Sequence, residues 1–80
     1  MWDLVSFVKR GKIRREIMSL LNAPKSPSDL AKKTKYHRSA ISRAILELEK
    51  KGLVECLTPN ESVGRLYRIS GSGKKILEKI

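Results

Sequence analysis

The sequence predicts a small, mainly helical domain with one β-hairpin, an α+β arrangement. Two observations support this. Between residues 12 and 52, apolar residues recur at helical spacing in three segments separated by Pro, Asn or a short polar turn. Residues 53–70 then hold two β-prone runs around a loop rich in turn formers. With residues 71–80 again at helical spacing, the expected order is helix, helix, helix, strand, strand, helix, preceded by a helical extension over residues 1–11.

Length and charge limit the possible partners. Eighty residues suit one domain with a modest core. Lys and Arg number 18 against 8 Asp and Glu, a net charge of +10. Residues 1–46 hold 11 basic and 3 acidic side chains, whereas residues 47–80 hold 7 and 5. Such an excess indicates a polyanionic partner, most commonly nucleic acid.

Several functional classes are disfavoured. No apolar run approaches the roughly 18 residues of a spanning helix, and the apolar start lacks the pattern of a signal peptide. One cysteine, Cys56, excludes an intrachain disulfide and fits a reducing cytoplasm. His37 and Cys56 are too few ligands for a tetrahedral metal site, and no catalytic carboxylate pair or phosphate loop is evident. We therefore expect no enzyme, metal, cofactor, membrane contact or small-molecule ligand.

The first quarter of the chain holds two helical patterns. Residues 1–11 are rich in large apolar groups, which either cover the domain's own core or pack against another subunit. Trp2 and Phe7 favour the partner interface. Gly11 is expected to kink the helix. Residues 12–22 form the first core helix, with Arg14 and its neighbours pointing outward. Its apolar positions are Ile13, Ile17, Leu20 and Leu21.

Residues 26–52 are predicted to form two helices split by a turn at residues 35–37. Ser26, Pro27 and Asp29 form a capping-box pattern. The second helix is expected from about Arg38 to Lys51, ending at Gly52. Its apolar face comprises Ile41, Ala44, Ile45 and Leu48. Its outer face carries Ser39, Arg43 and Lys50, with Ser42 on the flank.

A helix of this kind has the chemistry to lie in a DNA major groove, where Arg pairs bidentately with guanine. A basic face that is only solvated is the ordinary alternative, and this stretch alone leaves both open. Leu46 also projects toward the outer half of the helix. We expect it to pack beside the hairpin, with a thymine methyl group as the alternative partner.

The last third holds the hairpin and a closing helix. Strands are expected at residues 53–58 and 65–70, with Tyr67 and Ile69 on one face. Residues 71–80 then form a helix capped by Ser70 or Ser72, which is expected to dock on the N-terminal helix. Its apolar residues are Ile76, Leu77 and Ile80.

Three strings resemble the winged helix-turn-helix domains of bacterial and archaeal transcription regulators of the MarR and ArsR type. They read S-P-S-D-L-A, S-A-I-S-R-A-I-L-E-L-E-K-K-G-L-V-E and Y-R-I-S-G-S-G-K-K-I-L. The resemblance covers about residues 12–80 and implies a regulator that binds double-stranded DNA. It implies a helix-turn-helix at 26–52, a wing at 53–70 and a C-terminal helix at 71–80. Length gives one domain over residues 1–80, and the apolar residues of 1–11 give a possible dimer contact there.

The resemblance also assigns DNA-binding positions. The groove-facing residues are Ser39, Ala40, Ser42 and Arg43; phosphate neighbours are Ser26, Ser28, His37 and Arg38; the wing residues are Asn60 and Arg65. Lys35, in the turn, completes the candidate DNA-binding set. Two departures from the family matter. Lys35 stands where relatives often have Gly or Asn, which costs about 1 kcal/mol if its backbone is left-handed. Glu61 places an acid at the wing tip.

The sequence leaves two alternative functions open and predicts one oligomeric state. A winged helix can serve as a protein-interaction module within a larger complex, which the apolar N-terminus and Glu61 favour. RNA binding has less support, because only four aromatic residues are present and no stacking platform is evident. A homodimer is expected, because paired recognition helices read half-sites about one turn apart. We expect residues 1–11 to form it together with the apolar residues of the last helix.

Overall fold

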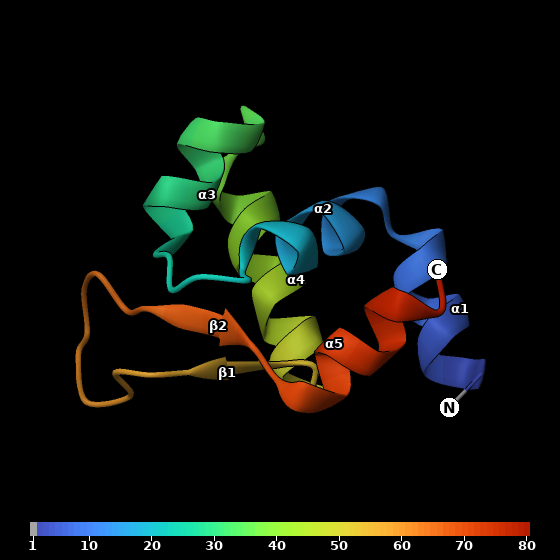
Figure 1. Ribbon diagram of the computed structural model, residues 1–80. Helices are drawn as coiled ribbons and strands as arrows, with labels where there is room; N and C mark the ends of the chain where they lie inside the picture. The colour runs from blue at the N-terminus through green and yellow to red at the C-terminus, as the bar shows by residue number, and fades with distance from the viewer. Residues whose placement is uncertain (1) are drawn as a thin grey trace.

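The computed structural model describes residues 2–80. Its elements are α1 (Trp2–Arg10), α2 (Lys12–Leu20), α3 (Pro27–Thr34), α4 (Arg38–Lys50), β1 (Val54–Cys56), β2 (Tyr67–Ile69) and α5 (Gly71–Glu78). In Figure 1, α3 and the loop of the hairpin lie at one end of the molecule and α1 and α5 at the other, with α2 and α4 between them. The predicted α+β order is confirmed.

Local sequence signals set the ends of α3 and α4. The Ser26 hydroxyl accepts from the Asp29 N–H at 3.2 Å, and the Asp29 carboxylate accepts from the Ser26 N–H at 3.1 Å. The capping box is thus present. Lys35 ends α3 with φ 66° and ψ 14°, a left-handed conformation that strains a non-glycine residue by about 1–2 kcal/mol. Gly52, at φ 73°, takes the chain out of α4 without that strain.

The expected kink at Gly11 is a break. Gly11 is extended, with φ −105° and ψ 100°, and stands just before the first residue of α2. Its N–H still bonds to the Val8 carbonyl at 3.1 Å, which closes α1. Because the extended backbone interrupts the helical hydrogen bonds, α1 and α2 can turn relative to each other and both cover the core.

The core lies between α2, α4, the base of the hairpin and α5. The inner face of α4 is buried as predicted, through Ile41, Ala44, Ile45 and Leu48. In the α2 region, Ile17 and Leu21 are fully buried together with Met18, while Ile13 and Leu20 are only partly covered. No polar or charged side chain is buried among residues 2–80. Packing of α4 on this core therefore fixes which of its faces meets solvent.

The hairpin is shorter than predicted, with three-residue strands paired antiparallel as Val54↔Ile69, Glu55↔Arg68 and Cys56↔Tyr67. A nonlocal contact supports it. The Lys25 N–H donates to the Tyr67 carbonyl at 3.1 Å, and the Tyr67 N–H donates to the Lys25 carbonyl at 2.9 Å. Tyr67 and Ile69 are both buried, as their shared face predicted. The base of the hairpin is thus anchored to the segment that precedes α3.

The last helix begins at a serine cap, since the Ser70 hydroxyl accepts from the Gly73 N–H at 3.0 Å. It packs against α1 and α2, which confirms the expected docking on the N-terminal helix. Gly73 is buried where α5 crosses the base of the hairpin. A Cβ atom there would overlap the Leu53 carbonyl oxygen, so this crossing needs glycine.

Candidate nucleic-acid interface

The outer face of α4 is the first part of the candidate interface. Ser39, Ser42 and Arg43 are exposed on it, and Lys50 extends the same face by two turns. These residues line one shallow groove with Leu46 and Glu47. Because the opposite side of α4 is buried, these predicted DNA-binding positions are held on a rigid support.

The one acidic side chain in this groove, Glu47, is paired with α2. The Arg14 Nε and Nη2 atoms each lie 3.3 Å from a different Glu47 oxygen. Arg14 also donates from Nη1 to the Phe7 carbonyl at 2.8 Å, and its guanidinium lies 3.9 Å from the centre of the Phe7 ring. The pair neutralises a carboxylate that would otherwise repel phosphate, and it ties α4 to α1 and α2. The prediction that Arg14 points outward is wrong.

A second hollow lies between the start of α3, the start of α4 and the wing. It has a volume of about 170 Å³. Four predicted residues line it together, namely Ser26, Ser28, Arg38 and Arg65. The Arg65 Nε donates to the Glu61 carbonyl, which holds the arginine along the wing loop. Two guanidinium groups and two hydroxyls in one concave place have the chemistry to hold a phosphate.

The helix terminus beside this hollow already carries a negative charge. The Ser26 backbone N–H, and after it the Ser26 hydroxyl, holds the pKa of the Asp29 carboxyl below its usual value. Asp29 therefore stays ionised at the positive end of α3. As a result, attraction for a phosphate here must come from Arg38 and Arg65 rather than from the α3 terminus.

The remaining predicted residues are dispersed. Lys35, His37 and Asn60 are exposed and line neither hollow, and the His37 side chain makes no cap bond to α4. Ala40 is half-buried and lines a different groove together with Arg43, toward the connection between α1 and α2. Leu46 is 55% exposed, so the expectation that it packs beside the hairpin is wrong. The chain leaves α4 through Leu53, which is fully buried, and carries the hairpin to the core side of the helix.

Tyr36 holds the turn between α3 and α4 against α2. Its hydroxyl donates to Glu16 Oε1 on α2 at 2.9 Å. That hydrogen bond, together with partial burial, raises the pKa of Tyr36 above its usual value. Sequence reasoning missed this contact, as it missed Arg14 with Glu47, because neither pair is local in the chain.

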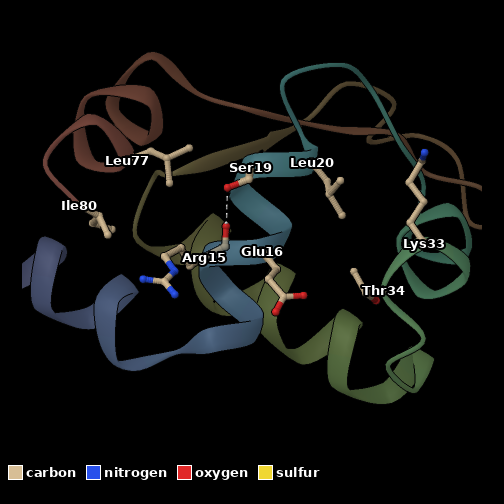
Figure 2. Close-up of a pocket in the computed structure, with 8 residues that line it drawn as sticks. All are labelled: Arg15, Glu16, Ser19, Leu20, Lys33, Thr34, Leu77 and Ile80. Atoms are coloured by element: carbon tan, nitrogen blue, oxygen red, sulfur yellow. Dashed lines mark hydrogen bonds between the residues drawn. The ribbon is translucent and has the colours of Figure 1, made fainter.

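A larger hollow lies elsewhere, between α2, α3 and α5, with a volume of about 660 Å³. Figure 2 shows its mixed lining, in which the Ser19 hydroxyl donates to the Arg15 carbonyl at 3.1 Å. No predicted DNA-binding residue lines this hollow. Over residues 2–80, His, Cys, Asp and Glu side chains do not gather into any group of three that could hold a metal ion. Within the same residues, every helix is too short or too polar to cross a membrane.

Helices α2 to α4, the two-stranded wing and the exposed basic face of α4 define a winged helix-turn-helix protein. The sequence profile of the MarR family matches residues 17–65, more than half of the chain, and the chain belongs to that family. It is 37% identical over 76 residues to the uncharacterized HTH-type transcriptional regulator YdgG of Bacillus subtilis, with 85% of this chain and 50% of the relative covered.

Solved structures agree. The transcriptional regulator BldR from Sulfolobus solfataricus superposes with a TM-score of 0.74 at 27% identity, covering 84% of this chain and 50% of BldR. A mutant MarR from E. coli, crystallised with operator DNA, superposes with a TM-score of 0.78 at 26% identity, covering 94% of this chain and 56% of that protein. The chain thus spans about half the length of these relatives.

Proposed function

We propose that this chain binds double-stranded DNA as a transcriptional regulator, with α4 in the major groove and the wing on the flanking backbone or minor groove. One observation carries the proposal. The core holds α4 so that Ser39, Ser42 and Arg43 face outward, while the acid on that face is neutralised by Arg14. The relationship to HTH-type regulators, one of them crystallised with operator DNA, supports the same role.

The division of labour follows from the chemistry. Lys and Arg side chains supply affinity by displacing the counterions of the phosphates. The hollow that contains Arg38 and Arg65 sets the register on the backbone, and Ser39, Ser42 and Arg43 read base edges. This is a binding role without catalysis, and the free thiol of Cys56 suits a cytoplasmic setting.

We further propose a homodimer formed by α1 and the end of α5. Trp2 is 73% exposed and Ile80 is 37% exposed, so both offer apolar surface at that end of the molecule. Ile76, expected at this interface, lies in the core and cannot contribute. Light scattering at high micromolar concentration tests the dimer: twice the mass of the chain is expected, and a monomer contradicts it.

The first experiment measures binding to a random 30-base-pair duplex by fluorescence anisotropy over a salt series. We expect micromolar affinity that falls steeply with salt, with a logarithmic slope of about −0.9 per phosphate neutralised. A duplex selected from a randomised pool then gives the specific site. On it, Arg43→Ala should cost about 1–3 kcal/mol and relax specificity.

The matched control is Lys75→Ala, which removes one exposed charge from α5 instead of α4. We expect it to weaken selected and random duplexes equally and only slightly. Equal losses for Arg43→Ala on both duplexes would contradict its role in base reading. Weak, salt-insensitive binding of every duplex would instead favour the alternative of a protein-interaction module, which the exposed Trp2 and the acidic wing residue Glu61 support.

A further inference from the structure

Leu46 is an apolar residue on the otherwise polar outer face of α4. It is 55% exposed and lines the same groove as Ser39, Ser42, Arg43 and Lys50. Leu46 lies seven residues after Ser39 and three after Arg43, on the third turn of α4. It belongs to the face of α4 that is proposed to lie in the DNA major groove.

Packing within the domain does not account for a leucine there. Its neighbours on the inner face, Ile45 and Leu48, are 1% and 0% exposed, so α4 is anchored without Leu46. The wing, which was expected to pack beside Leu46, does not cover it, and the side chain remains exposed to solvent. Single exposed leucines are ordinary on protein surfaces. Leu46 differs because Arg43 and Lys50 line the same hollow on α4, and their positive charges attract a polyanion to it.

We propose that Leu46 is a specificity-determining residue that contacts the C5-methyl group of a thymine in the major groove. The inference rests on the proposed function. The thymine methyl is the apolar group that base pairs present in that groove, and apolar side chains recognise it. Contact with it removes the exposed part of Leu46 and the methyl from water together.

The helix geometry places the thymine. Arg43 and Leu46 are separated by three residues, or about 4.5 Å along the axis. This is slightly more than one base-pair step of about 3.4 Å. If α4 lies along the groove, the thymine should fall one or two base pairs from the guanine that Arg43 reads. Ser39, about 10 Å from Leu46 along the axis, should then contact bases about three steps away.

Deoxyuridine tests the contact, because it lacks only the C5-methyl group. The probe is a duplex selected from a randomised 20-base-pair pool, in which each thymine in turn is replaced by deoxyuridine. Wild-type protein should lose about fourfold in affinity at one thymine, which corresponds to about 0.8 kcal/mol for one buried methyl group. Leu46→Ala should bind the unmodified duplex about fourfold more weakly and should be indifferent to deoxyuridine at that position.

Two controls separate contact from folding and from charge. Leu46→Met keeps an apolar side chain of similar reach and should retain the sensitivity to deoxyuridine. Leu46→Ala should fold normally, because the residue is half-exposed and alanine is a strong helix former. Its salt slope should equal that of wild type, because no phosphate contact is removed.

The possible failures are distinguishable. If wild type and Leu46→Ala respond alike to every deoxyuridine while both bind the selected duplex in a salt-dependent way, this inference is wrong and the proposed function stands. The inference is also wrong, and the proposed function still stands, if Leu46→Ala lowers the affinity for all duplexes equally. It is likewise wrong if Leu46→Ala leaves every affinity unchanged, which is the result expected if Leu46 contacts a protein partner. If wild type binds no duplex in a salt-dependent way, both proposals fail.

Discussion

Helix α4 and the wing belong to one candidate interface but are held in place differently. One side of α4 is packed into the core through Ile41, Ile45 and Leu48. In the wing, by contrast, none of residues 57–66 is buried. Their shape depends on their own hydrogen bonds, such as those from the Leu57 N–H to the Leu66 carbonyl at 2.8 Å and from the Leu66 N–H to Thr58 Oγ1 at 3.0 Å. In Figure 1 the loop extends away from the helices.

This difference suggests a division between precision and adaptability. Base reading needs side chains held to within about 0.5 Å, which a buried helix face provides. Phosphate contacts tolerate adjustment, because the charge of the backbone is repeated at every step. A loop with few packed contacts also opens at low free-energy cost. We therefore expect mutations to act on folding when they touch α4 and on local shape when they touch the wing.

The largest contrast is expected between Leu48→Ala and Val63→Ala. Leu48 is fully buried, so its truncation leaves a cavity and should lower the free energy of unfolding by about 2–5 kcal/mol. Val63 in the wing loop is 82% exposed, and its truncation should change that free energy by less than about 0.5 kcal/mol. Urea denaturation measures both. Similar losses for the two variants would show that the wing is as firmly packed as α4.

Gly73→Ala should show where the firmly packed part of the wing begins. The added Cβ would overlap the Leu53 carbonyl oxygen and lie 2.7 Å from Ile69 Cγ1, at the base of the hairpin. We expect a loss of about 1–3 kcal/mol in the free energy of unfolding, as for other overpacked positions. Gly71→Ala is the control, because its Cβ would meet nothing within 4 Å. Equal stability of the two variants would mean that this crossing has room to relax.

Two ion pairs within residues 2–80 repeat the contrast on a smaller scale. Arg14 bonds to Glu47 and to the Phe7 carbonyl, so we expect Arg14→Met to lower the free energy of unfolding by about 1–2 kcal/mol. The remaining exposure of Glu47, at 41%, limits the loss through solvent screening. Arg68 pairs with Glu55 across the wing, where both side chains are about half exposed, and Arg68→Met should cost about 0–0.5 kcal/mol.

The double variant Arg14→Met/Glu47→Gln sharpens this test, because it removes the carboxylate that Arg14 neutralises. DNA affinity lost in Arg14→Met should partly return in the double variant. Chemical denaturation and anisotropy provide the two measurements. A double variant that binds no better than Arg14→Met would indicate that Glu47 does not repel DNA.

The smallest effect is expected from the exposed cap of α3. The pKa of Asp29 is lowered in the folded protein, mainly by the hydrogen bond from the Ser26 N–H. Its stabilising contribution is therefore complete above the usual value of 3.8 and disappears as pH falls below it. Thermal unfolding of wild type and Asp29→Asn over a pH series that crosses 3.8 measures this. Wild type should be more stable at neutral pH, with the difference shrinking in acid; a constant difference would contradict the assignment.

Predictions from the sequence were accurate where the interaction is local. Ser26 and Asp29 are three residues apart, so their cap could be read directly, as could the turn out of α4 at Gly52. The buried face of α4 followed from helical periodicity. The predictions were wrong where a side chain contacts a residue far away in the chain. Arg14 was expected in solvent because Glu47 lies 33 residues away in the chain.

The candidate site shows the same limit. Periodicity predicted that Ser39 and Arg43 share an outer face with Ser42 on its flank, but not that the hairpin leaves Leu46 exposed beside them. It could not place Arg38 and Arg65 in one hollow, since Arg65 reaches that position only through the path of the wing. A hydrophobic pattern identifies which side of an element is covered, without specifying the element that covers it.

For this protein, the sequence alone determined the type and order of the elements, their caps, the inner face of α4 and the excess of positive charge. These depend on interactions between residues within about four positions of one another, or on composition. Only the tertiary structure decided that Arg14 neutralises Glu47, that Tyr36 is held by Glu16, that Lys25 supports the wing and that Leu46 is exposed. Each of these is set by how packed helices and strands meet, which local spacing does not encode.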